Sequence, residues 1–172
     1  ALTGLFLLTP EGALGGMLHV LFHATIKVCL FLVAGSIIHN TGKTNVDEFD
    51  GIGKAMPKTL WAFTFAALAL IGIPPASGFV SKWYLAMGAL DSGMAVYSWL
   101  TPVVLLISAL LTAGYLLPVT VRGFFPGKDA VLPPKNDEGG WGMVAPIWIL
   151  AALTLLLGLC AGSMLGAMES LT

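Results

Sequence analysis

Charged side chains are scarce in this chain. Only 10% of its 172 residues are Asp, Glu, Lys or Arg, whereas 57% are hydrophobic. Soluble domains carry about 25% charged residues, and a soluble fold of this length could not bury so much apolar surface. The apolar runs also lack the strict alternation that is typical of barrel strands. The composition therefore predicts an all-α membrane protein, a polytopic bundle that forms a single transmembrane domain over residues 1–172.

Several functional signatures are missing as well. The net charge of −1 gives no basis for nucleic-acid binding. The two cysteines, Cys29 and Cys160, lie within apolar runs, and no CxxC or Cys/His ligand spacing is present, so we expect neither a disulfide framework nor a metal site. No Gly-rich phosphate motif follows a strand pattern. We therefore expect no cofactor, no catalytic residue and no redox chemistry in this chain itself.

Polar loops divide the chain into four predicted membrane crossings. The apolar segments are each long enough for a bilayer, which needs about 20 residues. They cover residues 13–38, 59–90, 92–121 and 144–168, and the polar loops cover 40–58 and 122–142. Residues 2–9 have the composition of the end of an earlier helix that stops at Pro10. This pattern predicts the C-terminal part of a longer protein.

The second apolar segment, 59–90, contains a double proline and could be one broken crossing or a hairpin of two. If it is one crossing, both polar loops lie on one side of the membrane, with all six basic loop residues. These are Lys43, Lys54, Lys58, Arg122, Lys128 and Lys135. A hairpin would divide them three against three. Because cytoplasmic loops concentrate Lys and Arg, the bias favours one broken crossing with loops 40–58 and 122–142 in the cytoplasm.

The helix break is predicted around Pro74, Pro75 and Gly78. Two adjacent prolines remove backbone donors and clash with the preceding turn. Broken helices are tolerated at membrane depth only where protein or a water-filled cavity covers them. Lys82 follows the break, and burying a lysine there costs about 2.5–3.5 kcal/mol, so the residue is a candidate proton site. Snorkelling of Lys82 to the outer surface is the alternative.

His19, His23 and Lys27 form one helical stripe in the first crossing. Each step of four residues turns a helix by about 400°, so the three positions drift by only about 40° per step. A neutral imidazole can accept a proton on one nitrogen and release one from the other. We interpret the stripe as a proton-translocation path that faces the protein interior. Packing histidines or a metal site at the two histidines are the alternatives.

The motifs resemble those of one family. They are HVLFHATIKVCLFL at residues 19–32, GIPPASGFVSK at 72–82, and the connecting DEFDGIGKAMP at 47–57. The chain is similar here to the antiporter-like proton-translocating subunits of respiratory complex I, shared with Mrp-type sodium/proton antiporters and membrane-bound hydrogenases. The resemblance implies about fourteen helices in two inverted repeats, of which this chain would hold the last four. It also implies that Lys82 is the terminal proton site and that His19, His23 and Lys27 lead to it.

The expected function is proton translocation within an NADH:quinone oxidoreductase-type complex, with no redox step in this chain. The alternatives are a component of an Mrp-type antiporter, a component of a hydrogenase, or a membrane scaffold that transports nothing. The expected partners are the lipid bilayer, other membrane subunits and protons, with sodium as a second candidate ion. We expect the protein to be multi-pass in the cell (inner) membrane.

Overall fold

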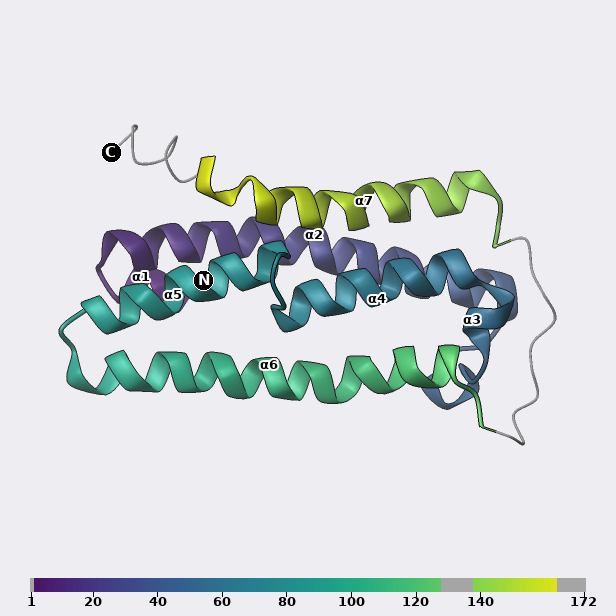
Figure 1. Ribbon diagram of the computed structural model, residues 1–172, viewed down its shortest axis with the longest axis horizontal. Helices are drawn as coiled ribbons and strands as arrows, with labels where there is room; N and C mark the ends of the chain where they lie inside the picture. The colour runs from purple at the N-terminus through teal and green to yellow at the C-terminus, as the bar shows by residue number, and fades with distance from the viewer. Residues whose placement is uncertain (1, 128–137, 164–172) are drawn as a thin grey trace.

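The computed structural model describes residues 2–127 and 138–163, and every regular element in these two ranges is a helix (Figure 1). In chain order they are α1 (Leu2–Phe6), α2 (Pro10–Thr41), the 3-10 helix η1 (Val46–Glu48), α3 (Ile52–Ala55), α4 (Pro57–Ile71), α5 (Ser77–Asp91), α6 (Ala95–Phe124) and α7 (Trp141–Leu159). By length and composition, α2, α6 and α7 can each cross a membrane. The predicted all-α transmembrane bundle is confirmed.

The broken crossing is the pair α4 and α5. The two helices have 15 residues each, too few for a crossing of about 20 residues on their own. They follow one another end to end along the bundle, and α6 runs the full length beside them (Figure 1). The two helices do not fold back as a hairpin, as the one-crossing interpretation of segment 59–90 expects.

The ends of the long helices differ from the ends of the predicted crossings. The segment 13–38 lies within α2, which begins earlier because Pro10 occupies the first helical turn, where its missing N–H is not needed. The Thr9 side chain caps this end by accepting from the Gly12 amide at 3.2 Å. At the other crossings, α6 spans Ala95–Phe124 and α7 begins at Trp141. Residues 164–168 of the last predicted crossing lie outside the described residues.

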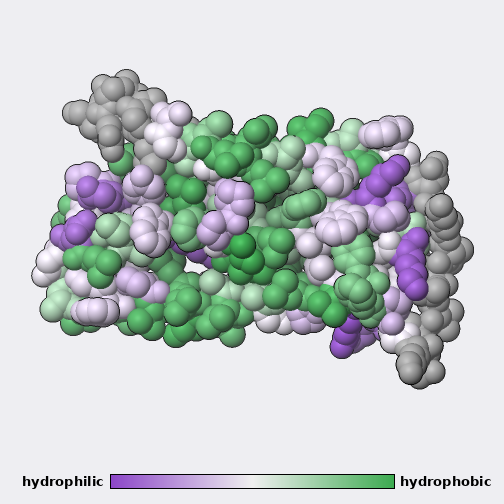
Figure 2. All heavy atoms as spheres, viewed as in Figure 1, coloured by the Kyte–Doolittle hydropathy of each residue, from purple (hydrophilic) through white to green (hydrophobic). Residues whose placement is uncertain are grey.

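One end of the bundle gathers the charged loop residues. The Arg122 side chain at the end of α6 pairs with Asp47 at 2.8 Å, and the Gly51 amide donates to the Arg122 carbonyl at 3.1 Å. The short helices η1 and α3 lie at this end (Figure 1). Hydrophobic residues cover most of the middle of the face in Figure 2, and hydrophilic ones gather toward its ends. Lys128 and Lys135, two of the six basic loop residues, lie outside the described residues.

The core joins α2 to α4 and α7. One face of α2 buries Ile26, Val33 and Ile37 in this cluster, and the facing side of α4 contributes small residues such as Ala62 and Ala66. Small side chains let membrane helices approach closely, and van der Waals packing then stabilises their association. This cluster therefore packs α4 against α2 and α7.

Candidate functional site

The helix break covers residues 72–76. Gly72 ends α4 with a φ of 95°, a conformation that favours glycine, and its amide donates to the Leu68 carbonyl at 3.1 Å. Pro74 and Pro75 lie within the break and are exposed. Gly78 lies in the first turn of α5, where a Cβ atom would collide with the Ala69 carbonyl oxygen. The absence of a side chain at Gly78 thus lets α5 pack directly on the last turn of α4.

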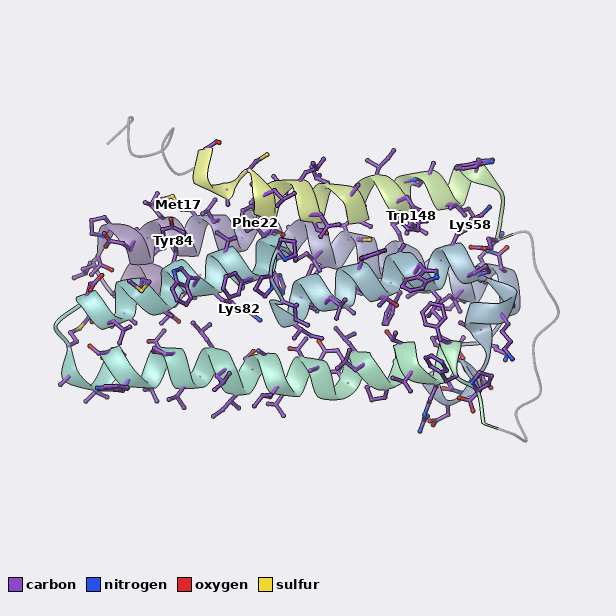
Figure 3. All side chains as sticks on the ribbon, viewed as in Figure 1. Met17, Phe22, Lys58, Lys82, Tyr84 and Trp148 are labelled. Carbon is purple, nitrogen blue, oxygen red and sulfur yellow. The ribbon has the colours of Figure 1, made fainter. Side chains whose placement is uncertain are left out.

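Lys82 binds the backbone of the broken helix. Its ammonium donates to the carbonyl of Leu70 at 3.0 Å and to that of Ile71 at 2.8 Å. The last carbonyls of a helix have no intrahelical partner, and the negative end of the helix dipole favours a cation there. Figure 3 shows Lys82 beside the interruption between α5 and α4. The charged group therefore lies at the break and not at the C-terminal end of α5.

His19 is tied to the broken helix by a hydrogen bond. Its Nδ1 lies 3.0 Å from Oγ of Ser81, the residue before Lys82. Ser81 is fully buried, and its hydroxyl also donates to the Gly78 carbonyl at 3.3 Å. His23 follows one turn later on α2, and the two imidazole rings are stacked with their centroids 5.5 Å apart. The structure thus brings the two histidines to the face of α2 that contacts α5.

Lys27 continues the stripe but makes fewer contacts. It is half-buried, and within ranges 2–127 and 138–163 its ammonium has no hydrogen-bond partner. His23 lies within electrostatic range of both Lys27 and Lys82. Along α2, His23 lies about one turn from both His19 and Lys27.

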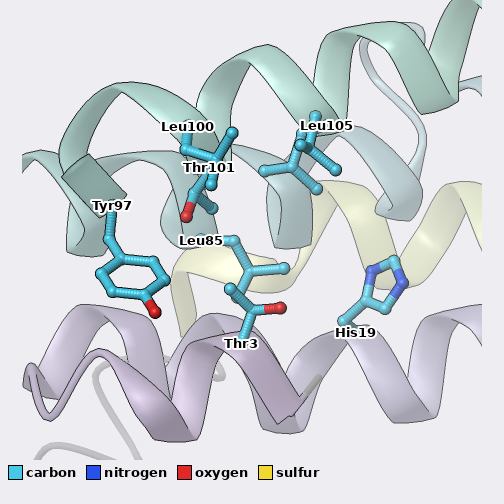
Figure 4. A pocket seen from close by; sticks show the side chains of 8 residues that line it. Thr3, His19, Leu85, Tyr97, Leu100, Thr101 and Leu105 are labelled. Carbon is cyan, nitrogen blue, oxygen red and sulfur yellow. The ribbon is translucent and has the colours of Figure 1, made fainter.

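Two cavities adjoin these side chains. One of about 250 Å³ lies beside His19, with Thr3, Leu85 and Tyr97 among its lining residues (Figure 4). A second, of about 190 Å³, is a largely open surface pocket lined by Lys82 together with residues of the break, the end of α4, α5 and α6. Either volume has room for several water molecules, each of which takes up about 30 Å³. The polar groups that line them include His19 and Thr3 in the first and Lys82 in the second.

Two residues, one in α5 and one that contacts the N-terminal end of α4, were not singled out from the sequence. Ser81 could have been found from the sequence, because a hydroxyl group next to a lysine in a membrane segment can exchange hydrogen bonds with groups along a proton path. Glu138 gave no such indication, because it stood among other charged residues of a polar loop. In the structure Glu138 is only 5% exposed, and its carboxylate accepts hydrogen bonds from the first turn of α4.

Comparison with known proteins agrees with this architecture. Residues 1–112 match the family model described as NADH:quinone oxidoreductase/Mrp antiporter, TM. The chain is 40% identical to NADH-quinone oxidoreductase subunit N of Desulforudis audaxviator, over 84% of the chain and 30% of that protein. It is 33% identical to a Na(+)/H(+) antiporter subunit of Bacillus subtilis, over 92% of the chain and 31% of that protein.

A solved structure shares the fold. A chain of respiratory complex I from Thermus thermophilus superposes with a TM-score of 0.75 at 25% identity, over 94% of this chain and 32% of that one. The chain belongs to the membrane-subunit family of NADH:quinone oxidoreductases and Mrp antiporters. The resemblance inferred from the sequence motifs is therefore confirmed, and the chain spans about a third of the length of these relatives.

Proposed function

We propose that this chain forms one proton half-channel of an antiporter-like membrane subunit, with Lys82 as the group that binds and releases the transported proton. One observation carries the proposal: the Lys82 ammonium contacts two helix-end carbonyls, at 3.0 and 2.8 Å, beside a cavity within an otherwise apolar crossing. The carbonyls solvate the charged form, and water in the cavity can accept a proton from it. A lysine at this depth makes membrane insertion less favourable, so its presence there is consistent with a role as a proton carrier.

His19, His23 and Lys27 supply the path in this proposal. A proton that leaves Lys27 is taken up by a ring nitrogen of His23, and the opposite nitrogen releases another toward Lys82 through water. His19, which contacts Ser81 and lines the 250 Å³ cavity, accepts and releases protons in the same way. Each transfer moves one proton between a nitrogen or water donor and a lone pair, so no other bond is made or broken.

The identity of the membrane complex is a separate part of the proposal. We assign the chain to an NADH:quinone oxidoreductase-type complex in the cell membrane, where other membrane subunits are its partners and a separate subunit oxidises NADH. The relative at 40% identity that is named for this complex supports the assignment. An Mrp-type setting, supported by the relative at 33% identity, is the second candidate.

Proton transport by the full-length protein in its complex tests both the role of Lys82 and the assigned complex. Sealed inverted vesicles are energised with NADH, or with an imposed sodium gradient, and internal acidification is followed with a pH-sensitive dye. We expect NADH to drive acidification in the wild type and Lys82→Met to remove most of it. Lys82→Glu should retain part of the transport, because a carboxyl group can also bind and release a proton.

The control is Leu156→Met on α7, an exposed residue whose substitution roughly conserves volume. It should transport as the wild type does. Transport driven only by the sodium gradient would move the chain to the antiporter setting. Full transport by an assembled Lys82→Met variant would refute the role of Lys82 and favour a scaffold.

A further inference from the structure

The first half of the broken helix, α4, is held by a charged side chain at each end. At its C-terminal end the Lys82 ammonium binds the carbonyls of Leu70 and Ile71. At its N-terminal end, which Lys58 marks in Figure 3, the Glu138 carboxylate accepts from the amides of Lys58 at 3.2 Å and Thr59 at 2.8 Å. It also accepts from the Thr59 hydroxyl at 2.8 Å. Neither charged group belongs to α4 itself.

Glu138 is placed there by an unusual piece of backbone. It precedes α7 and lies 79 positions from Thr59 in the sequence. Its φ is 56°, and Gly139 and Gly140 follow at 73° and 71°. A left-handed conformation is uncommon for a residue with a side chain, and a buried carboxylate is unfavourable unless it is hydrogen-bonded. A left-handed backbone that buries a carboxylate with three hydrogen bonds points to a specific role for that charge.

The signs of the two charges match the helix between them. A carboxylate is favourable at the N-terminus of a helix and a cation at its C-terminus. Since α4 has 15 residues, the two groups are separated by about 22 Å of helix, too far for a strong direct attraction. Both groups bind α4 directly, so the position of this helix along its axis is the link that their hydrogen bonds supply.

We propose that Glu138 is a positioning residue that fixes α4 along its axis, so that the carbonyls of Leu70 and Ile71 stay within hydrogen-bonding distance of Lys82. The inference rests on the proposed function, because it gives Glu138 an effect on proton transport through Lys82. Without the carboxylate, the first-turn amides of α4 lose their partner. The helix is then free to move along its axis, and the break around residues 72–76 loosens.

Two measurements on the full-length protein in its complex test this role. Glu138→Ala should reduce proton transport per assembled complex by about tenfold or more, as expected when a transfer group loses its alignment. Glu138→Gln, which keeps an acceptor oxygen but loses the charge, should fall between this variant and the wild type. The matched control is Glu48→Gln, an exposed carboxylate at the same end of the bundle that bonds only within its own loop. It should leave transport unchanged.

Hydrogen–deuterium exchange separates positioning from local capping. Loss of the cap alone would speed exchange only in the first turn of α4. The proposal requires faster exchange in peptides covering residues 72–82 as well, in Glu138→Ala and to a smaller extent in Glu138→Gln. Unchanged exchange at 72–82, or normal transport by Glu138→Ala, would overturn it. If Lys82→Met abolishes transport while both Glu138 variants transport normally, only this inference fails; if Lys82→Met transports fully, the proposed function fails first.

Discussion

Gly158 on α7 provides a direct test of how the helix break is packed. A Cβ atom there would lie 2.6 Å from the amide nitrogen of Ser77 and 2.7 Å from the carbonyl carbon of Ala76, and it would also collide with the carbonyl oxygen of Pro75. All three atoms belong to the backbone, and the proline ring restricts how that segment can move. Gly158→Ala should therefore lower the free energy of unfolding by about 1–3 kcal/mol, the range for overpacked sites.

Gly114→Ala on α6 is the matched control. No atom lies within 4 Å of the position that its Cβ would take, and alanine within a helix is about 0.5–1 kcal/mol more stable than glycine. The same chemical change should therefore have opposite signs at the two sites. Denaturant unfolding of both variants of the purified full-length protein in detergent measures the difference. If Gly158→Ala is as stable as Gly114→Ala, the close packing of α7 on the break is wrong.

Two further predictions concern single hydrogen bonds and ion pairs. Ser81→Ala removes the partner of the His19 imidazole, so proton transport in vesicles should fall about 2- to 10-fold, the equivalent of one hydrogen bond. Equal transport by this variant and by a Ser108→Ala control on the exposed face of α6 would contradict that expectation. Arg122→Gln breaks the pair with Asp47, whose side chains are 51% and 91% exposed, so the free energy of unfolding should change by only about 0–1 kcal/mol. A loss well above that range in denaturant unfolding would show that this pair holds the loop to α6.

The break itself could be predicted because its cause is local. Pro74 and Pro75 cannot continue a helix, whatever surrounds them, and the basic residues of the loops indicated one crossing rather than two. The helix ends were less predictable. Pro10 marked a stop in the sequence but starts α2 in the structure, because a proline that cannot continue one helix can occupy the first turn of the next.

The partners across the bundle could not be predicted in the same way. The contact between His19 and Ser81 joins positions 62 residues apart, and it depends on how α2 and α5 are rotated against each other. The periodicity of α2 showed which residues share a stripe, but it could not show which residue of α5 the stripe faces. Glu138 depends on the path of a whole loop, and its local sequence gives no sign that its carboxylate is buried.

Reaction-induced infrared difference spectroscopy shows whether Lys82 gains and loses a proton during transport. The full-length protein in its complex is labelled with nitrogen-15 at the lysine side chains and studied during turnover, as wild type and as Lys82→Met. We expect an isotope-sensitive lysine ammonium band that changes during turnover in the wild type and is missing from the difference spectrum of Lys82→Met. The same lysine band in both proteins would show that Lys82 keeps its charge and would contradict its proposed role.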